Sequence, residues 1–483
     1  MRAIVVGSGI GGLASAIRLK KLGYKVIILE KNDIIGGRMG YIENNGYFFD
    51  TGPTLLLMLK PLIELFKEVE ENISDYLNLI KIDPLYRIYF NDGNFLEPSN
   101  DLAYYVKQVS LKEFKNLLKF YSDITYMYND TIYNFVEKNY YSIFDFINLK
   151  SLKLLLKHRM LDNLYNRVSS YFNDYRLIFA NTFQSMYLGI SPFSAPFVYT
   201  VVNYMEAIEG IYYPIGGMYQ IVKALEKIIN KMNIRILREV EVKEIDKKTN
   251  TIYTNKGFFD ADVIIVNADL PYAKSELLNE KLPNYEYSCS TIMLYIGYEG
   301  STNMLHHNVF LTDNYKQSFD SIFKKGTIPN DLSFYVNISS KTDEGQAPKN
   351  SENIYILIPI PNLKVLRENL NEKLNEIINK VFDRLEGQTN FRRERIKFIV
   401  KRTPYDWQSL YNLKYGSAFG LSHKFLQSAY FRPKNYEKEG IYYVGASTIP
   451  GSGIPMVLIS SKLAIQRIIK DFNKKELKYE LSH

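Results

Sequence analysis

A complete nucleotide-binding βαβ pattern occupies the first 30 residues of the chain. Residues 2–6 (RAIVV) predict a buried parallel strand, which runs directly into the turn GSGIGG at 7–12. A helix is expected from there to Gly23, followed by a second strand at 25–29 that ends in Glu30. A chain that begins in this way is constrained to build a parallel sheet with a phosphate-binding helix N-terminus at its carboxyl edge.

Each glycine of this turn has a separate physical role. Gly7 permits the tight turn, Gly9 leaves space for a diphosphate, and Gly12 allows the helix and the strand to pack closely. Glu30 follows at the distance where a carboxylate can bind ribose hydroxyl groups. The spacing predicts a bound dinucleotide, and an ordinary strand–turn–helix without a ligand is the alternative.

A second glycine pair follows the acid. The segment 31–38 (KNDIIGGR) places Gly36 and Gly37 where backbone can approach the same diphosphate, and Arg38 where a guanidinium can neutralise it. A simple NAD dehydrogenase does not need this second clamp. The pattern therefore favours FAD over NAD, the alternative being that Arg38 is a solvated surface side chain.

Composition excludes several classes of protein. The length of 483 residues suggests about three domains. The single cysteine, Cys289, excludes disulfides and multi-cysteine metal sites and is typical of a reducing compartment. A net charge of +8 suits an anionic membrane surface but does not indicate nucleic acid, because the aromatic residues lie in apolar runs. We expect neither a signal peptide nor a spanning helix, because the first strand starts at residue 2 and no run of about 18 apolar residues occurs.

The order of expected elements changes twice along the chain. Residues 55–206 read mostly as helices, apart from a short strand-like patch at 86–95. After Gly210 come a helix to about Met232, strands at 235–237, 240–245 and 262–266 with a hairpin between the last two, and then an antiparallel region at 286–400 with a helix at 371–386. A buried strand at 441–444, a glycine-rich turn and a last helix to about Asp471 complete the chain.

The C-terminal turn is the second informative motif. Residues 445–456 (GASTIPGSGIPM) connect a strand to a helix that opens near Ile454. The positive end of this helix would stabilise the anion that forms when a flavin ring takes up a hydride. A capped strand–helix connection without a ligand is the alternative.

Motifs along nearly the whole chain resemble one family. The matching segments are GSGIGG at 7–12, Glu30, GGR at 36–38, FDTGP at 49–53, YP at 213–214, GGM at 216–218, NAD at 267–269, HHN at 306–308, YV at 335–336, TD at 342–343, AP at 347–348, GSAFGLSH at 416–423, FRP at 431–433 and the turn at 445–453. On these residues the chain is similar to the bacterial-type phytoene desaturases, which are FAD-dependent carotenoid dehydrogenases among the amine oxidase-like flavoproteins. Ile449 stands where the family usually carries a polar residue such as His, so the turn does not specify which carotenoid is used or how many desaturations follow.

The resemblance implies an α/β fold in three parts. A Rossmann-type FAD-binding domain would be assembled from 1–78, 207–274 and 435–483, and a sheet-based substrate domain from 79–100 and 275–434. A helical membrane-associated part, 101–206, would cover an apolar tunnel. The resemblance assigns the adenosine and diphosphate half of FAD to Gly7, Gly9, Gly12, Glu30, Gly36, Gly37, Arg38 and the backbone of Val242. It places Gly52, Gly445, Ala446, Gly453, Ile454 and Met456 around the flavin ring.

The implied reaction is the removal of a hydride and a proton from a linear carotene, with a quinone or oxygen as electron acceptor. Such chemistry needs an electron sink and an apolar slot, and it does not need a strong nucleophile. A dedicated base is optional, and its candidates are Arg176, Glu206 and Asp406, each of which can also be a buried salt bridge or a helix cap. The five histidines include no pair with helical zinc spacing, so no metal site is expected and His306-His307 reads as structural.

One segment has the pattern of a helix that lies on a membrane. In 149–161 (LKSLKLLLKHRML), leucines at 149, 152, 155 and 156 share one helical arc with Met160, and Lys150, Lys153 and Lys157 share another. Leu154 falls on the lysine side, and a soluble helix with a solvated basic face has the same pattern. We expect a cytoplasmic protein that is peripheral to the membrane.

Three functions remain open at this point. The first is carotenoid desaturation. The second is another reaction on the same fold, either carotenoid isomerisation or oxidation of an amine. The third is a flavin-free prenyl-lipid carrier, which the C-terminal turn at 445–456 and the Gly36-Gly37-Arg38 clamp argue against.

Overall fold

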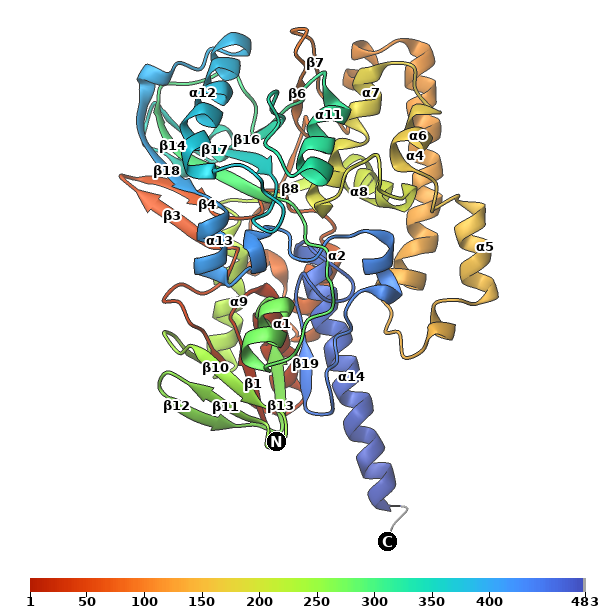
Figure 1. Cartoon of the computed structure of the whole chain (residues 1–483), viewed down its shortest axis with the longest axis vertical. Coiled ribbons are helices and arrows are strands. Elements are labelled where there is room, and N and C mark those ends of the chain that lie inside the picture. The colour runs from red at the N-terminus through yellow and green to blue at the C-terminus, as the bar shows by residue number, and fades with distance from the viewer. Residues whose placement is uncertain (481–483) are drawn as a thin grey trace.

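A five-stranded parallel sheet holds the N-terminal nucleotide-binding unit. The computed structural model (Figure 1) describes residues 1–480. Within them, the strand order of this sheet is β19-β13-β1-β2-β9, and every neighbouring pair is parallel. The strands are β1 (Arg2–Val6), β2 (Lys25–Leu29), β9 (Arg235–Leu237), β13 (Val263–Val266) and β19 (Ile441–Tyr443). The expected strands in all three parts of the chain are confirmed, and they meet in one sheet.

Three helices pack against this sheet because their apolar faces meet its buried strands. They are α1 (Ile10–Lys21), α9 (Tyr219–Lys231) and α14 (Ile454–Glu480). The Ser15 hydroxyl donates to the Ser461 hydroxyl at 2.9 Å, and Arg18 Nη1 donates to the carbonyl of Leu458 at 3.1 Å, so α1 and α14 lie side by side. The expected end of the last helix near Asp471 is wrong, because α14 continues to Glu480.

A hairpin sheet adjoins the parallel sheet. It consists of β10 (Val242–Asp246), β11 (Thr251–Thr254) and β12 (Gly257–Asp260), all antiparallel. The expected strand at 240–245 begins two residues later, because the amide of Val240 instead donates to the carbonyl of Glu30. This bond ties the hairpin to the end of β2.

A seven-stranded sheet forms the second layer, in the order β18-β14-β17-β16-β15-β6-β7. Its pairs are antiparallel except for β15 with β6, and one face is covered by α12 (Leu370–Gln388). Its strands are β6 (Arg87–Tyr89), β7 (Phe95–Leu96), β14 (Ser290–Glu299), β15 (His307–Phe310), β16 (Phe334–Ile338), β17 (Ser351–Ile360) and β18 (Ile396–Arg402). The strand-like patch at 86–95 therefore belongs to the same sheet as strands more than 200 residues later.

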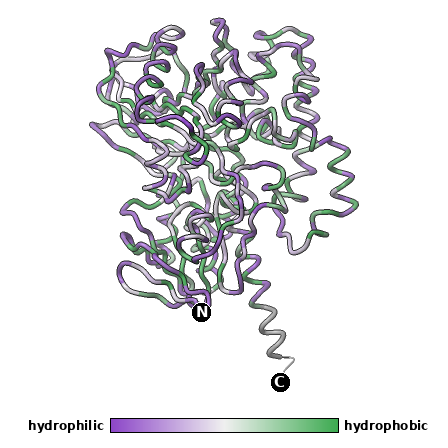
Figure 2. The backbone as a smooth tube through the Cα atoms, in the orientation of Figure 1, coloured by the Kyte–Doolittle hydropathy of each residue, from purple (hydrophilic) through white to green (hydrophobic). Residues whose placement is uncertain are grey.

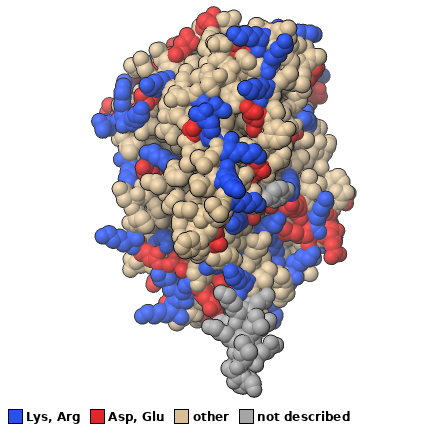
Figure 3. Space-filling model, turned by 90° about the vertical axis from the view of Figure 1, so that its right-hand side faces the viewer, with Lys and Arg blue, Asp and Glu red and all other residues tan. Residues whose placement is uncertain are grey.

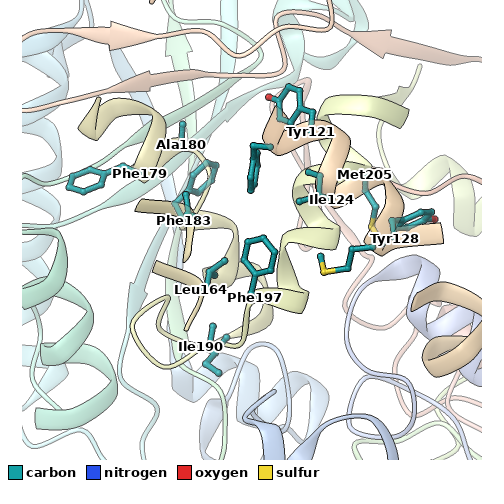
Figure 4. Close-up of a cluster of buried hydrophobic side chains, with 14 of the residues drawn as sticks. Tyr121, Ile124, Tyr128, Leu164, Phe179, Ala180, Phe183, Ile190, Phe197 and Met205 are labelled. Carbon is teal, nitrogen blue, oxygen red and sulfur yellow. The ribbon is translucent and has the colours of Figure 1, made fainter. Parts of the chain in front are cut away.

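The remaining helices gather beside the two sheets (Figure 1). The longest is α4 (Leu111–Thr131), and α5 (Leu149–Lys157) lies at the outer edge of the group. The other helices are α2 (Lys60–Glu68), α3 (Leu102–Tyr105), α6 (Leu164–Ser169), α7 (Tyr175–Ala180), α8 (Val201–Tyr204), α10 (Leu270–Tyr272), α11 (Tyr315–Asp320) and α13 (Pro404–Tyr411). Two small antiparallel sheets pair β3 (Tyr41–Asn44) with β4 (Tyr47–Asp50) and β5 (Leu79–Ile82) with β8 (Ile211–Pro214). Side chains of α3, α4, α6, α7, α8 and α11 meet in an apolar core, part of which Figure 4 shows around Phe183, Phe197 and Met205.

Between residues 1 and 480, no helix combines the length and the apolar character needed to cross a lipid bilayer.

Candidate functional site

One large cavity lies where the parallel sheet, the seven-stranded sheet and the helical part meet. Its volume is about 680 Å³, within the range of small-molecule and cofactor sites. One end is lined by the glycine-rich turns that follow β1, β2 and β19. These turns share the carboxyl edge of the parallel sheet, which is where open α/β sheets bind ligands.

The two N-terminal glycine clamps touch each other. Gly9 and Gly36 form a parallel bridge, and the amide of Gly36 donates to the carbonyl of Ser8 at 3.0 Å. A side-chain Cβ on Gly12 would lie 2.1 Å from the carbonyl oxygen of Gly7, so only glycine permits this approach of α1 to β1. The segments at 7–12 and 36–38 therefore form one wall of the cavity.

Glu30 lies buried at the end of β2 and lines the same wall. One carboxylate oxygen accepts bonds from the Ser8 amide at 2.8 Å and the Ser8 hydroxyl at 2.6 Å, and the other accepts from the Asn32 amide at 2.9 Å. These bonds hold the carboxylate at the cavity. Val242 lies nearby at the start of β10 and also lines it.

Asn267, which was quoted above only as part of a motif, lies at the centre of the glycine turns. A Cβ on Gly9 would lie 2.7 Å from its side-chain nitrogen, and a Cβ on Gly11 would lie 2.6 Å from its side-chain oxygen. Asn267 directly follows β13, the strand next to β1, and its backbone amide donates to the carbonyl of Val6. The sequence signal was a polar residue directly after a buried strand.

Arg38 is partly buried and lines the cavity. Its Nη1 donates to the carbonyl of Ala418 at 3.0 Å, which orients the guanidinium. Burial lowers the pKa of Arg38 from its ordinary value, while the negative charge of Asp269 acts in the opposite direction. The alternative that Arg38 is a solvated surface residue does not hold.

The C-terminal turn closes the opposite wall. Gly453 has φ +105°, and α14 begins at the next residue, so the first turn of a long helix lines the cavity. Its unpaired backbone donors lie there, apart from Pro455, which has no N–H. The Ser447 hydroxyl donates to Asp269 at 2.7 Å, which fastens the turn to the end of β13. Ala446, Ile454 and the side chain of Met456 also line the wall.

A fully buried arginine shapes this turn from behind. Arg432 Nε donates to the carbonyl of Thr448 at 3.0 Å, Nη1 to that of Gln427 at 3.1 Å, and Nη2 to that of Ala446. Burial lowers the pKa of Arg432 to about 10, so the guanidinium stays charged at neutral pH. The motif at 431–433 thus holds the turn in place.

His423 joins the turn to the helical part. Its Nδ1 lies 2.9 Å from the carbonyl oxygen of Leu188, and its Nε2 accepts a bond from the amide of Ser452 at 3.2 Å. The first contact requires a proton on Nδ1 and the second requires a free lone pair on Nε2. Burial keeps the pKa of His423 well below its usual value, so the ring is neutral.

The other half of the cavity is apolar. Its walls come from the helical part and from one face of the seven-stranded sheet, and Arg176, Glu206 and Asp406 do not line it. The lining includes Phe135, Phe146, Leu155, Met160, Leu161, Phe183, Met186, Val198, Val202, Met205, Val309, Leu311 and Leu357. Such a surface suits a long hydrocarbon and offers few groups to polar substrates.

The three candidate bases have structural partners instead. Arg176 pairs with Asp174 at 2.7 Å. Asp406 accepts from the amide and hydroxyl of Thr403, the N-cap of α13, and so completes the capping box of this helix. Glu206 accepts from the hydroxyl of Tyr86 at 3.1 Å and from the amide of Gln184 at 3.0 Å. Burial raises the pKa of Glu206 to about 7, but the carboxyl lies behind the cavity wall.

The arrangement fits a flavin dinucleotide. Gly52 lies at a close backbone crossing, where a Cβ would lie 2.1 Å from the carbonyl oxygen of Arg38. Of the expected cofactor residues, Gly12 does not line the cavity, because it lies where α1 crosses β1. The others all line it: Gly7, Gly9, Glu30, Gly36, Gly37, Arg38, Gly52, Val242, Gly445, Ala446, Gly453, Ile454 and Met456. Among the described residues no cluster of three His, Cys, Asp or Glu side chains could hold a metal ion.

Asp50 gives a prediction about stability. Its partly buried carboxylate accepts hydrogen bonds from the backbone amides of Met218 and Tyr219 at 2.8 and 2.9 Å, at the start of α9. Burial raises the pKa of Asp50 from 3.8 to about 6, although the two amide bonds lower it. Between pH 3.8 and about 6, Asp50 is protonated in the folded state and deprotonated in the unfolded state. The free energy of unfolding therefore falls as pH rises through this range, by about 3 kcal/mol in total.

The variant Asp50→Asn has no ionisable group at this position. The thermal midpoint of the variant minus that of the wild type should therefore increase as pH rises from about 4 to about 6. Above that range the difference should stay constant. Parallel midpoint profiles for the two proteins, both measured with excess FAD, would contradict this role of Asp50.

Known proteins share both the sequence and the fold of this chain. Residues 10–469 match the family described as flavin containing amine oxidoreductase. A zeta-carotene-forming phytoene desaturase of Myxococcus xanthus is 35% identical over 491 residues, covering 97% of this chain and 94% of the relative. A 4,4'-diapophytoene desaturase of Staphylococcus haemolyticus is 31% identical over 498 residues, covering 98% and 99%.

A solved oxidoreductase structure from Methanosarcina mazei superimposes with a TM-score of 0.65 at 19% identity, over 96% of this chain and all of the other. This likeness shows the fold. Together with the match over residues 10–469 and the glycine-lined cavity, it leads to one conclusion: the chain belongs to the flavin-containing amine oxidoreductase family.

Proposed function

We propose that the protein is an FAD-dependent carotenoid desaturase, which removes a hydride and a proton from phytoene or a related linear carotene and so adds conjugated double bonds. The observation that carries this proposal is the single cavity with two unlike halves. Glycine turns and helix N-termini line one half, and apolar side chains line the other. The desaturases named above are relatives over nearly their whole length.

In this proposal, the N-terminal clamps hold the adenosine and diphosphate. Glu30 binds ribose hydroxyl groups, the backbone of Val242 contacts the adenine, and Arg38 neutralises diphosphate charge. Gly52, Gly445, Ala446 and the turn at 453–456 surround the flavin ring. When bound, FAD supplies the electron sink that accepts the hydride.

The protein's own contribution is orientation and exclusion of water. Aromatic and aliphatic side chains such as Phe183, Met205 and Leu311 line the slot in which a polyene would extend past the ring. Because these side chains carry no polar groups, a hydrocarbon that fills the slot leaves no buried donor or acceptor without a partner. We also propose the domain boundaries that the sequence predicts, in which the helical part comprises residues 101–206.

Exposed apolar side chains lie on α5 and on segments near it, close to residues that line the slot. On α5, Leu149 is 78% exposed and Leu156 is 69% exposed, whereas Leu154 and Leu155 pack inward. Leu161 is 52% exposed and also lines the cavity, so it connects the exposed apolar surface to the cavity wall. We call this surface the α5 patch; it comprises Phe144, Ile147, Leu149, Leu152, Leu156, Leu161, Phe425, Leu426 and Phe431.

The two segments of the α5 patch are in contact, since the ring centroids of Phe146 and Phe431 lie 5.9 Å apart. Lys150, Lys153 and Lys157 are exposed beside the leucines, and the mixed hydropathy of α5 is visible in Figure 2. Figure 3 shows this side of the molecule, where broad uncharged areas lie between Lys and Arg side chains. We assign the α5 patch to a membrane surface, from which a carotene would enter, in a cytoplasmic peripheral protein.

Replacing Leu149, Leu152 and Leu156 together with serine should weaken co-sedimentation with anionic liposomes by about tenfold or more, because three leucines no longer enter the lipid. A matched variant replaces three exposed apolar residues elsewhere, Leu22, Phe258 and Val365, and should bind as the wild type does. Equal liposome binding by both variants would remove α5 from the membrane contact.

The function itself is tested by supplying phytoene in liposomes with FAD and a quinone, and then repeating the assay with oxygen as acceptor. Desaturation lowers the product mass by two hydrogens for each new double bond, whereas isomerisation leaves it unchanged. A wild-type protein that binds no flavin would favour a prenyl-lipid carrier. Turnover of amines without change in the carotene would favour an amine oxidase.

A further inference from the structure

A polar group interrupts the apolar part of the cavity wall at Tyr335. Its side chain projects from β16 on the face of the sheet that lines the cavity, between Val309 and Leu357 of the neighbouring strands. The hydroxyl lies 2.8 Å from the hydroxyl of Thr54 and 2.7 Å from Nδ1 of His307. Tyr335 therefore links the cavity to a buried histidine.

The hydrogen bonds around His307 assign its protons. The side-chain nitrogen of Asn337, which can only donate, lies 3.2 Å from the same Nδ1 and 3.2 Å from the carbonyl oxygen of His306. Nδ1 is therefore an acceptor that the hydroxyl of Tyr335 and the amide of Asn337 share. The proton of the neutral ring is then on Nε2, which has no hydrogen-bond partner among the described residues. Thr54 then donates to the phenol oxygen.

The position of Tyr335 is close to the proposed flavin ring. Its ring centroid lies 6.2 Å from that of Tyr355 on β17, and the Tyr355 hydroxyl donates to the carbonyl of Gly52 at 3.0 Å. Thr54, which contacts the phenol, is two residues beyond Gly52 and also lines the cavity. Tyr335 thus lies between the cofactor half and the apolar half.

The nearest other titratable groups differ from Tyr335 in their partners: Tyr187 also lines the cavity, but its charge couples most strongly to the buried Glu206 rather than to a histidine. His423 is bonded to backbone at both nitrogens, and Glu206 is behind the wall. His306 stands beside His307, with ring centroids 4.3 Å apart, and its Nδ1 contacts the hydroxyl of Thr342 at 2.7 Å. Neither His306 nor His307 lines the cavity, whereas the phenol of Tyr335 does.

We propose that Tyr335 is the group that accepts the proton from the carotene and passes its own proton to His307. This inference rests on the proposed desaturation. After hydride loss leaves a cationic carbon, the neighbouring C–H bond breaks and its electron pair forms the new double bond. The released proton bonds to the phenol oxygen while the original phenol proton moves to Nδ1, which leaves neutral Tyr335 and an imidazolium at His307.

The surroundings of His307 suit a temporary proton store. Burial, and the neighbouring His306, hold the pKa of His307 well below its usual value. The low pKa does not prevent the transfer, because a C–H bond beside a carbocation is a far stronger acid than an imidazolium. The same low pKa drives release of the proton through Tyr335 to water once the product has left.

The first test needs no turnover. In protein labelled with ¹⁵N-histidine, wild-type His307 should show an unprotonated, hydrogen-bonded Nδ1 and a protonated Nε2. Tyr335→Phe should move the Nδ1 resonance toward that of a free imidazole nitrogen, without a change in visible flavin absorbance. A wild-type ring protonated at Nδ1 could not accept the proton and would overturn the proposal.

The second test separates proton transfer from structure. Tyr335→Phe and His307→Asn should each lower single-turnover desaturation by about 100-fold or more, the usual contribution of acid–base groups. Asparagine retains an acceptor near the position of Nδ1 but cannot take up the proton, so a purely structural His307 would tolerate it. Tyr295→Phe is the matched control, since it removes a hydroxyl that bonds only to the carbonyl of Thr51, at 3.0 Å.

An isotope effect completes the test. With phytoene deuterated at the carbon that loses the proton, the kinetic isotope effect should rise in Tyr335→Phe, because proton removal becomes rate-limiting. Rates within about threefold of wild type in both variants would overturn the relay, since acid–base catalysis supplies far more. An inactive wild type would instead contradict the proposed function, so the two failures are distinguishable.

Discussion

Replacing Gly9 with valine is expected to abolish FAD binding. A Cβ at this position would already lie 2.7 Å from the side-chain nitrogen of Asn267, and the two further methyl groups would fill the space between the clamps at 7–12 and 36–38. Overpacking costs about 1–3 kcal/mol, and lost diphosphate contacts add to it. We therefore expect FAD affinity to fall by at least about a hundredfold, so that the protein purifies without its visible flavin absorbance.

The matched control is Gly387→Ala in α12, where a Cβ has no heavy atom within 4 Å and φ needs no glycine. It should retain the flavin. Thermal melting of both variants without FAD shows whether Gly9→Val still folds. A folded Gly9→Val protein with a full complement of flavin would show that the glycine-lined half of the cavity is not the diphosphate site.

Gly453→Val should lower both the flavin reduction potential and the rate of desaturation. The nearest heavy atom to a Cβ here is 4.0 Å away, so the cost does not come from crowding. It comes from φ +105°, which a β-branched residue does not tolerate, and the turn must move to relieve it. The first amides of α14 would then no longer point at the ring.

Loss of such a donor set costs about 2.7–4 kcal/mol in related electrostatic sites, which corresponds to a rate loss of about a hundredfold or more. Anaerobic titration measures the potential, and single-turnover desaturation measures the rate. Ile459→Val, which trims a buried side chain of α14 and leaves its amides in place, is the control. A Gly453→Val protein with unchanged potential and rate would mean that the turn only connects β19 to α14.

Local patterns were sufficient for the elements that build the cofactor half. The expected strands at 2–6 and 25–29 coincide with β1 and β2, and the helix expected at 371–386 is α12, from Leu370 to Gln388. Glycines gave the positions of both clamps, because a close backbone approach excludes every other side chain. The extension of α14 to Glu480 was missed, since a polar helix end has no periodic apolar signal.

The hydrogen-bond partners of individual polar residues could not be predicted from the sequence. Asp406, one candidate base, belongs to the capping box of α13, and Glu206 lies behind the cavity wall, although both residue types suit acid–base chemistry. On α5, helical periodicity separated leucines from lysines, but only packing showed that Leu154 and Leu155 face inward while Leu149 and Leu156 remain exposed.

The sequence by itself determined the βαβ unit, the two glycine clamps, the turn before α14 and the family resemblance, because each depends on residues close together in the chain. Only the tertiary structure decided which distant groups meet. Thr54, His307 and Tyr335 come from a loop and two strands, and their contact depends on the register between β15 and β16. A shift of one residue in that register would turn Tyr335 to the opposite face of the sheet.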